Sequence, residues 1–143
     1  MEKNEWYKRW KISADKWIET VKAVTEKRPF NTDFGYSDLT VAGECGHCLE
    51  HTQGCNHCRL FKTRIRWRRV CNGPSSKVWP LNPHFHCFID EMRKPDPDFE
   101  KALKHAKMIL RTVLGDCPNR AQAEQDGISF VVHGVFIPVE HTR

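Results

Sequence analysis

The feature that most constrains this chain is a pair of closely spaced cysteine units, Cys45-Gly46-His47-Cys48 and Cys55-Asn56-His57-Cys58. Two residues separate the cysteines of each unit, so both sulfurs can reach one ion, and a tetrahedral zinc accepts four thiolates at about 2.3 Å. The six residues between the units reach about 20 Å when extended, which is more than such a site needs. The spacing therefore predicts a compact zinc knuckle. The predicted ligands are Cys45, Cys48, Cys55 and Cys58.

The ligand set has open alternatives. Cys71 follows the second unit after twelve residues and is a possible substitute ligand, as is His51. We expect His47 and His57 to stay out of the coordination sphere, because each lies in a loop already held by two thiolates. An iron–sulfur cluster uses the same thiolate chemistry and is the alternative cofactor. A thioredoxin-like redox role needs a helix after the second cysteine of the unit. It is disfavoured here, because only six residues follow Cys48 before the next cysteine unit begins.

Length, charge and hydropathy describe a modest globular protein. The 143 residues are most simply one domain, 1–143, with 39% hydrophobic and 29% charged residues. The first ten residues are charged and lack the apolar core of a secretory signal, and no apolar run is long enough to span a bilayer. The odd count of seven cysteines argues against a complete disulfide framework, so we expect a cytoplasmic protein with no membrane partner. A net charge of +5 permits a polyanion partner without requiring one.

Two segments have the periodicity of amphipathic helices. In residues 5–27, apolar side chains recur every three or four positions, and Pro29 follows the pattern. Trp6 and Trp10 in this stripe are either core residues, which burial habits favour, or a docking surface for another protein. The second helix is expected over 97–114, with Asp96 as its N-cap. Pro97 then takes the first helical position and Gly115 the C′ position.

A dense basic run lies between the cysteine units and Cys71. Residues 59–70 carry six cations and no acid. If the run is one strand, alternate cations share a face, which makes a ridge suited to phosphate contacts, and Trp67 could stack on a base. The competing interpretation is a solvated strand face whose charges prevent edge-to-edge aggregation. The candidate nucleic-acid contacts are Lys62, Arg64, Arg66, Trp67, Arg68 and Arg69.

Further short strands are expected at 77–79, 84–89 and 128–139, the last interrupted by Gly134. In the 84–89 strand, His84 and His86 would share one face with Asp90 in line, which is a weak signal for a second metal or for acid–base chemistry. Structural, partly exposed histidines are the alternative interpretation. His105 lies among lysines and is expected at the surface.

Residues 13–73 resemble a family of small uncharacterised cysteine-rich proteins of phages and bacteria. The family pattern has a Lys-Trp on an early helix, two Cys-x-x-Cys units, an apolar residue after the second unit and a fifth cysteine before glycine. This sequence departs from it at Arg59, where proline is usual, and in the basic link before Cys71. The resemblance implies metal binding, supports Cys71 as a fifth position and implies no reaction. The matching residues are Lys16-Trp17, Cys45, Cys48, Cys55, Cys58, Leu60 and Cys71-Asn72-Gly73.

The predicted fold class is α+β, with two amphipathic helices packed on short antiparallel strands and a compact zinc-knuckle insertion within a metal-binding and basic segment, 39–73. Four protein ligands leave no open position on the metal, so Zn²⁺ is expected to be structural. The sequence contains no nucleotide-binding loop or nucleophile elbow, which lowers the expectation of an enzyme. Three functions remain open. They are a zinc module that binds DNA or RNA, an adaptor that docks a host or virion protein through Trp6 and Trp10, and a metallohydrolase built on His84, His86 and Asp90.

Overall fold

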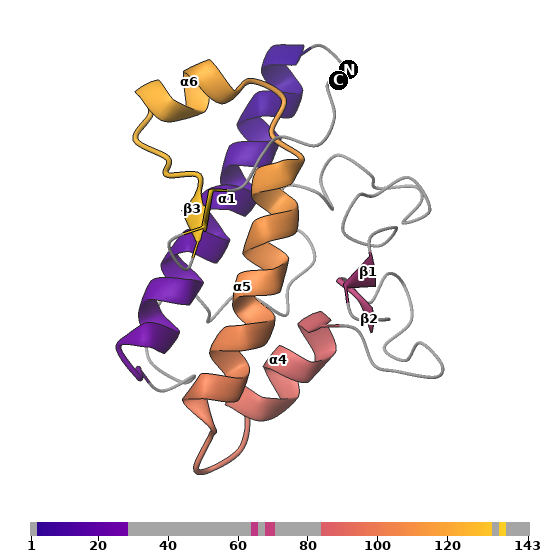
Figure 1. Cartoon of the computed structure of the whole chain (residues 1–143), viewed down its shortest axis with the longest axis vertical. Coiled ribbons are helices and arrows are strands. Elements are labelled where there is room, and N and C mark those ends of the chain that lie inside the picture. Colours follow the sequence, from indigo (N-terminus) through magenta and orange to yellow (C-terminus); the bar gives the residue numbers. More distant parts are fainter. Residues whose placement is uncertain (1–2, 29–63, 66–67, 71–83, 133–134, 137–143) are drawn as a thin grey trace.

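The structure, a computed structural model, describes residues 3–28, 64–65, 68–70, 84–132 and 135–136 (Figure 1). Most of these residues are helical. The helices are α1 (Lys3–Thr25), α4 (His84–Met92), α5 (Phe99–Gly115) and α6 (Arg120–Gln125). The strands are β1 (Arg64–Ile65), β2 (Arg68–Arg69), β3 (Val131–Val132) and β4 (Val135–Phe136). The predicted strand at 77–79 and the cysteine units lie outside the described residues.

Helix α1 confirms the first predicted amphipathic helix, displaced by two residues from the expected 5–27. Its tryptophan stripe faces inward, since Trp6, Trp10 and Trp17 are all buried. The core interpretation of the stripe is therefore confirmed. A docking surface made of Trp6 and Trp10 is wrong, because indoles at 3% and 0% exposure cannot present an interface to a partner.

Helices α1 and α5 run side by side in opposite directions and form the main packing layer (Figure 1). The Trp10 indole N–H donates to the carbonyl of Val113 at 2.6 Å, in the last turn of α5, where that carbonyl also accepts the backbone N–H of Asp116 at 3.2 Å. The Trp10 ring also stacks on Phe130, with 6.5 Å between centroids. One tryptophan thus joins α1 both to α5 and to the segment before β3.

Helix α4 corrects the strand predicted at 84–89. The strand interpretation placed Phe88 on the same face as the two histidines, so period two never separated apolar from polar residues. A helix instead gathers Phe88, Ile89 and Met92 on one buried side, and His84 lies one turn before Phe88 on that side. Trp17 of α1 meets this face edge-on at Phe88, with 5.8 Å between ring centroids. The nine residues of α4 leave the choice between strand and helix open in the sequence, and the helix is the form that packs on α1 and α5.

Helix α5 confirms the second amphipathic helix but begins two residues later than expected. The N-cap is Asp98, not Asp96, and its side chain accepts a hydrogen bond from the backbone N–H of Lys101 at 3.2 Å. Pro97 therefore precedes the cap. At the other end Gly115 is the last helical residue, not the C′ residue, and Asp116 is the C-cap.

Helices α1 and α6 end with the same pair of backbone hydrogen bonds. At the end of α1, the N–H of Arg28 donates to Ala23 and that of Lys27 donates to Val24, both at 3.0 Å. At the end of α6, the N–H groups of Ile128 and Gly127 bond Ala123 and Glu124 at 3.0 and 3.1 Å. This Schellman motif needs a left-handed C′ residue. Gly127 meets that need at φ 86°, whereas Lys27 adopts φ 57° with a side chain attached.

The strands are short antiparallel pairs, β1 with β2 and β3 with β4. In the second pair Val131 lies opposite Phe136 and Val132 opposite Val135, which confirms two short strands within the predicted 128–139 region. The predicted architecture of helices packed on strands is not confirmed for the described residues, because their core is formed mainly by α1, α4 and α5 packed on one another. Two-residue ladders offer too little surface to support a helical layer.

Candidate functional site

The predicted zinc ligands Cys45, Cys48, Cys55 and Cys58 lie outside the described residues, as do Cys71 and His51. Within the ranges that the structure describes, no group of three or more His, Cys, Asp or Glu side chains is placed to hold a metal ion. The zinc knuckle therefore stays a prediction of the sequence.

The basic segment reverses direction instead of continuing as one strand. Strand β1 pairs antiparallel with β2, so that Arg64 lies opposite Arg69 and Ile65 opposite Arg68. Positions 64 and 68 then fall on opposite faces of the ladder, because successive residues of a strand alternate. The predicted ridge with all alternate cations on one face is wrong. Lys62, Arg66 and Trp67, the other predicted contacts, lie outside the described residues.

Val70 fixes the end of this hairpin to the helices. The side chain of Val70 is fully buried, and its carbonyl accepts the backbone N–H of Phe85 at 3.0 Å. Phe85 is the second residue of α4, so its N–H has no acceptor within the helix. The start of α4 and the end of the basic hairpin are thereby held together. The sequence suggested no such connection, since Val70 appears there only as the last residue of a basic run.

The histidines of α4 are arranged differently from the prediction. Residues two apart on a helix are rotated by about 200°, so His84 and His86 point to different sides of α4 and Asp90 is exposed. A site built on His84, His86 and Asp90 is therefore wrong. The partner of His84 comes instead from α5. The two Nδ1 atoms of His84 and His105 lie 2.9 Å apart, and the ring centroids are separated by 5.1 Å.

This histidine pair is largely enclosed. His84 is only 1% exposed and His105 is half-buried, which corrects the expectation that His105 lies at the surface. Both Nδ1 atoms cannot carry protons at this separation, so at least one imidazole is neutral. A helical interpretation of 84–92 would have placed His84 on the buried face. Nothing in the sequence would have chosen His105 as its partner.

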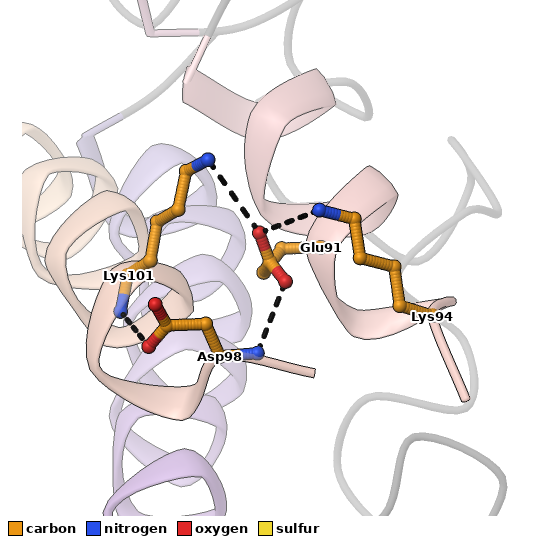
Figure 2. Close-up of polar contacts among 4 residues, drawn as sticks. All are labelled: Glu91, Lys94, Asp98 and Lys101. Atoms are coloured by element: carbon orange, nitrogen blue, oxygen red, sulfur yellow. Dashed lines mark hydrogen bonds and ion pairs between the residues drawn. The ribbon is translucent and has the colours of Figure 1, made fainter. Parts of the chain in front are cut away.

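A second cluster surrounds Glu91, the next-to-last residue of α4 (Figure 2). The carboxylate of Glu91 is 96% buried. It accepts the backbone N–H of Asp98 at 3.0 Å and the ammonium of Lys94 at 3.1 Å, with the ammonium of Lys101 at 3.7 Å. The hydrogen bond from Asp98 is the main cause that lowers the pKa of Glu91, and the two lysines add to it against the opposing effect of burial. Glu91 thus joins the end of α4 to the start of α5.

The cysteine at the end of α5 has a different character from a metal-binding thiolate. Burial raises the pKa of the Cys117 thiol to about 11, so it is protonated at neutral pH. Its side chain is 1% exposed and belongs to the core. The Cys117 thiol therefore serves packing.

Comparisons of this chain with protein-family models, with curated proteins and with solved structures found no match. The resemblance to small cysteine-rich phage and bacterial proteins therefore stays a prediction based on cysteine spacing. Among the described helices, none is both long enough and apolar enough to cross a membrane.

Proposed function

We propose that this chain is a small zinc-binding module that binds DNA or RNA through the basic segment that follows its cysteine units. In this proposal Cys45, Cys48, Cys55 and Cys58 hold a structural zinc, with Cys71 as the substitute ligand. The observation that carries the proposal is the run 59–70, which has six cations and no acid and directly follows two metal-type cysteine pairs. The proposed contacts are Lys62, Arg64, Arg66, Trp67, Arg68 and Arg69.

The register of the hairpin supports an anionic partner. Arg64 lies opposite Arg69, and like charges at opposite positions destabilise an antiparallel pair by a few tenths of a kcal/mol up to about 1 kcal/mol. Phosphate groups of a nucleic acid would neutralise the cations and remove the repulsion, so binding and hairpin formation favour each other.

The attachment of the hairpin supports a defined binding geometry. Val70 is buried and bonded to the start of α4, so the basic segment has a fixed point on the helical core. The described core is built from α1, α4, α5, Val70 and the residues around β3. We expect zinc to order the cysteine-rich segment, which precedes this fixed point in the chain.

The proposal is tested by measuring the affinity of the full chain for labelled single-stranded DNA, single-stranded RNA and duplex DNA at several salt concentrations. The test variant combines Arg64→Glu with Arg68→Glu. Because Arg64→Glu places a carboxylate opposite Arg69, it removes a like-charge pair and favours the hairpin. The control combines Lys104→Glu with Arg111→Glu, two exposed positions of α5, and changes the net charge equally.

We expect the hairpin variant to bind at least about tenfold more weakly, because two phosphate contacts become repulsive. The slope of log affinity against log salt should fall in magnitude by about 1.5, at 0.7–0.9 per contact. The control should change affinity much less. Equal weakening by both variants would reduce the interaction to net charge alone. An unchanged affinity in the hairpin variant would refute the proposed contacts.

A further inference from the structure

The pair formed by His84 and His105 is a built feature that the proposed function does not use. His84 begins α4 and His105 lies in the second turn of α5, so two helices supply one imidazole each. Their Nδ1 atoms face each other at 2.9 Å in a setting where His84 is almost fully enclosed. We propose that His84 and His105 are two ligands of a divalent transition-metal ion, at a site separate in its donors from the cysteine quartet.

The distance between the two nitrogens fits coordination to one ion. Imidazole nitrogens bind zinc at about 2.1 Å, so two of them lie about 3.0 Å apart at a 90° angle and about 3.4 Å apart at the tetrahedral angle. The observed 2.9 Å matches the first value and needs an opening of about half an ångström to reach the second.

The chemistry of the pair also suits a metal. A direct hydrogen bond between the two Nδ1 atoms requires one ring to carry its proton on Nδ1 and the other ring to leave Nδ1 bare. A metal ion instead accepts the Nδ1 lone pairs of both neutral rings in the same tautomer. Each ring then keeps a proton on Nε2, which can donate to a neighbouring acceptor as metal-bound histidines commonly do.

Neutral imidazoles and nitrogen donors define the class of ion. Such donors suit Zn²⁺, Ni²⁺ and Cu²⁺, whereas Ca²⁺ and Mg²⁺ prefer oxygen. Among the described residues no third His, Cys, Asp or Glu joins the pair, so water completes the coordination sphere of the ion in this proposal.

The test uses the full chain, labelled with ¹⁵N and freed of metal, titrated with Zn²⁺ while the imidazole nitrogen resonances are recorded. We expect the Nδ1 signals of His84 and His105 to shift together at saturation, with those of His86 unaffected. His86 is the internal control because it lies on the same helix but points to another side. Unchanged Nδ1 signals of His84 and His105 at saturating Zn²⁺ would overturn the proposal and leave a hydrogen bond between two helices.

Two variants give a second readout by isothermal titration with Zn²⁺. His105→Gln keeps a polar, half-buried side chain, so it tests the site without emptying the buried position of His84. We expect it to weaken binding of one ion per chain by more than about tenfold, since it removes a direct ligand where even the loss of an outer hydrogen bond costs 10–100-fold. His86→Gln should leave binding unchanged. Equal affinities of the His105→Gln variant and the unmodified chain would refute the site.

This inference and the zinc knuckle fail independently. In a variant with Cys48→Ser and Cys58→Ser, two of the predicted thiolates are removed while both imidazoles remain. We expect that variant to keep the Zn²⁺-dependent shifts of His84 and His105. Absence of zinc from the cysteines would therefore refute the proposed function without deciding the histidine site.

Discussion

Glu91 offers the sharpest test of how the helical core is held together. The variant Glu91→Ala removes the carboxylate that accepts the N–H of Asp98 and lies near the ammonium groups of Lys94 and Lys101 (Figure 2). A backbone N–H left without its acceptor in a partly buried site costs about 1–3 kcal/mol. The two lysines are more than half exposed, so each adds at most a few tenths of a kcal/mol. We therefore expect a loss of about 2 kcal/mol in the free energy of unfolding.

The variant Glu91→Gln separates the charge from the acceptor. It keeps an oxygen for the N–H of Asp98 but removes the negative charge, so we expect a loss of about 1 kcal/mol. The assay is urea unfolding monitored by circular dichroism, and the matched control is Asp90→Asn at the exposed neighbouring position. A Glu91→Ala variant as stable as Asp90→Asn would refute the role of Glu91 as the connection between α4 and α5.

The pH dependence of stability in the unmodified chain and in Glu91→Gln gives the sign of the charge effect. The pKa of Glu91 is lower in the folded state than its ordinary value of 4.5, so the carboxylate contributes stability that is fully present above pH 4.5. That contribution is lost as the pH falls through the folded-state pKa. The stability difference between the unmodified chain and Glu91→Gln should therefore be constant near neutral pH and shrink in acid. A difference that grows in acid would contradict this assignment.

The remaining predictions concern helix ends, the central indole and metal removal. Gly127→Ala should destabilise the fold by about 1 kcal/mol in thermal or urea unfolding. Because no neighbouring atom crowds a new Cβ, the whole cost comes from holding alanine at the positive φ of 86°. Lys27→Gly should stabilise the fold by about 0.5 kcal/mol, because glycine adopts the left-handed conformation without the strain that a side chain causes, although it adds entropy to the unfolded chain. A loss of stability in this variant would argue against the Schellman motif. Trp10→Phe should cost about 2 kcal/mol, because the buried carbonyl of Val113 loses the indole N–H and the core loses volume, and a neutral effect would refute that hydrogen bond. Chelation of the proposed zinc should weaken nucleic-acid binding yet leave the far-ultraviolet circular dichroism of the helices nearly unchanged, and global unfolding would show that the core depends on the metal.

The sequence predicted the long helices well and the short elements poorly. In α1 and α5 the apolar stripe recurs over four or more turns, so the period is unambiguous and the buried faces follow directly. The six residues His84–Ile89 are too few for their periodicity to decide between helix and strand, and in the structure they form a helix that packs against Trp17 and α5. The basic run fails for a related reason, because its alternating charges also suit a single strand and the reversal between 65 and 68 has no glycine or proline signal.

The candidate sites divide along the same line. The cysteine pattern is a local signal, because ligand spacing along the chain is itself the evidence for a metal. The histidine pair is a tertiary feature, since His84 and His105 are 21 residues apart and come together only because α4 folds back along α5. Sequence spacing chose His86 as the partner of His84 because that choice needed no knowledge of the fold. Correct placement of α4 as a helix would have removed His86 but could not have supplied His105.

The central claim, a zinc held by the cysteine units, is tested most directly by native mass spectrometry with elemental analysis on protein purified without oxygen. The unmodified chain should carry zinc, and the variant with Cys48→Ser and Cys58→Ser should carry one zinc fewer per chain. Cys117→Ser, which changes a buried thiol of the core, should keep the full count. An equal zinc count in the Cys48→Ser, Cys58→Ser variant, or iron and sulfide with visible absorption in the unmodified chain, would contradict the claim.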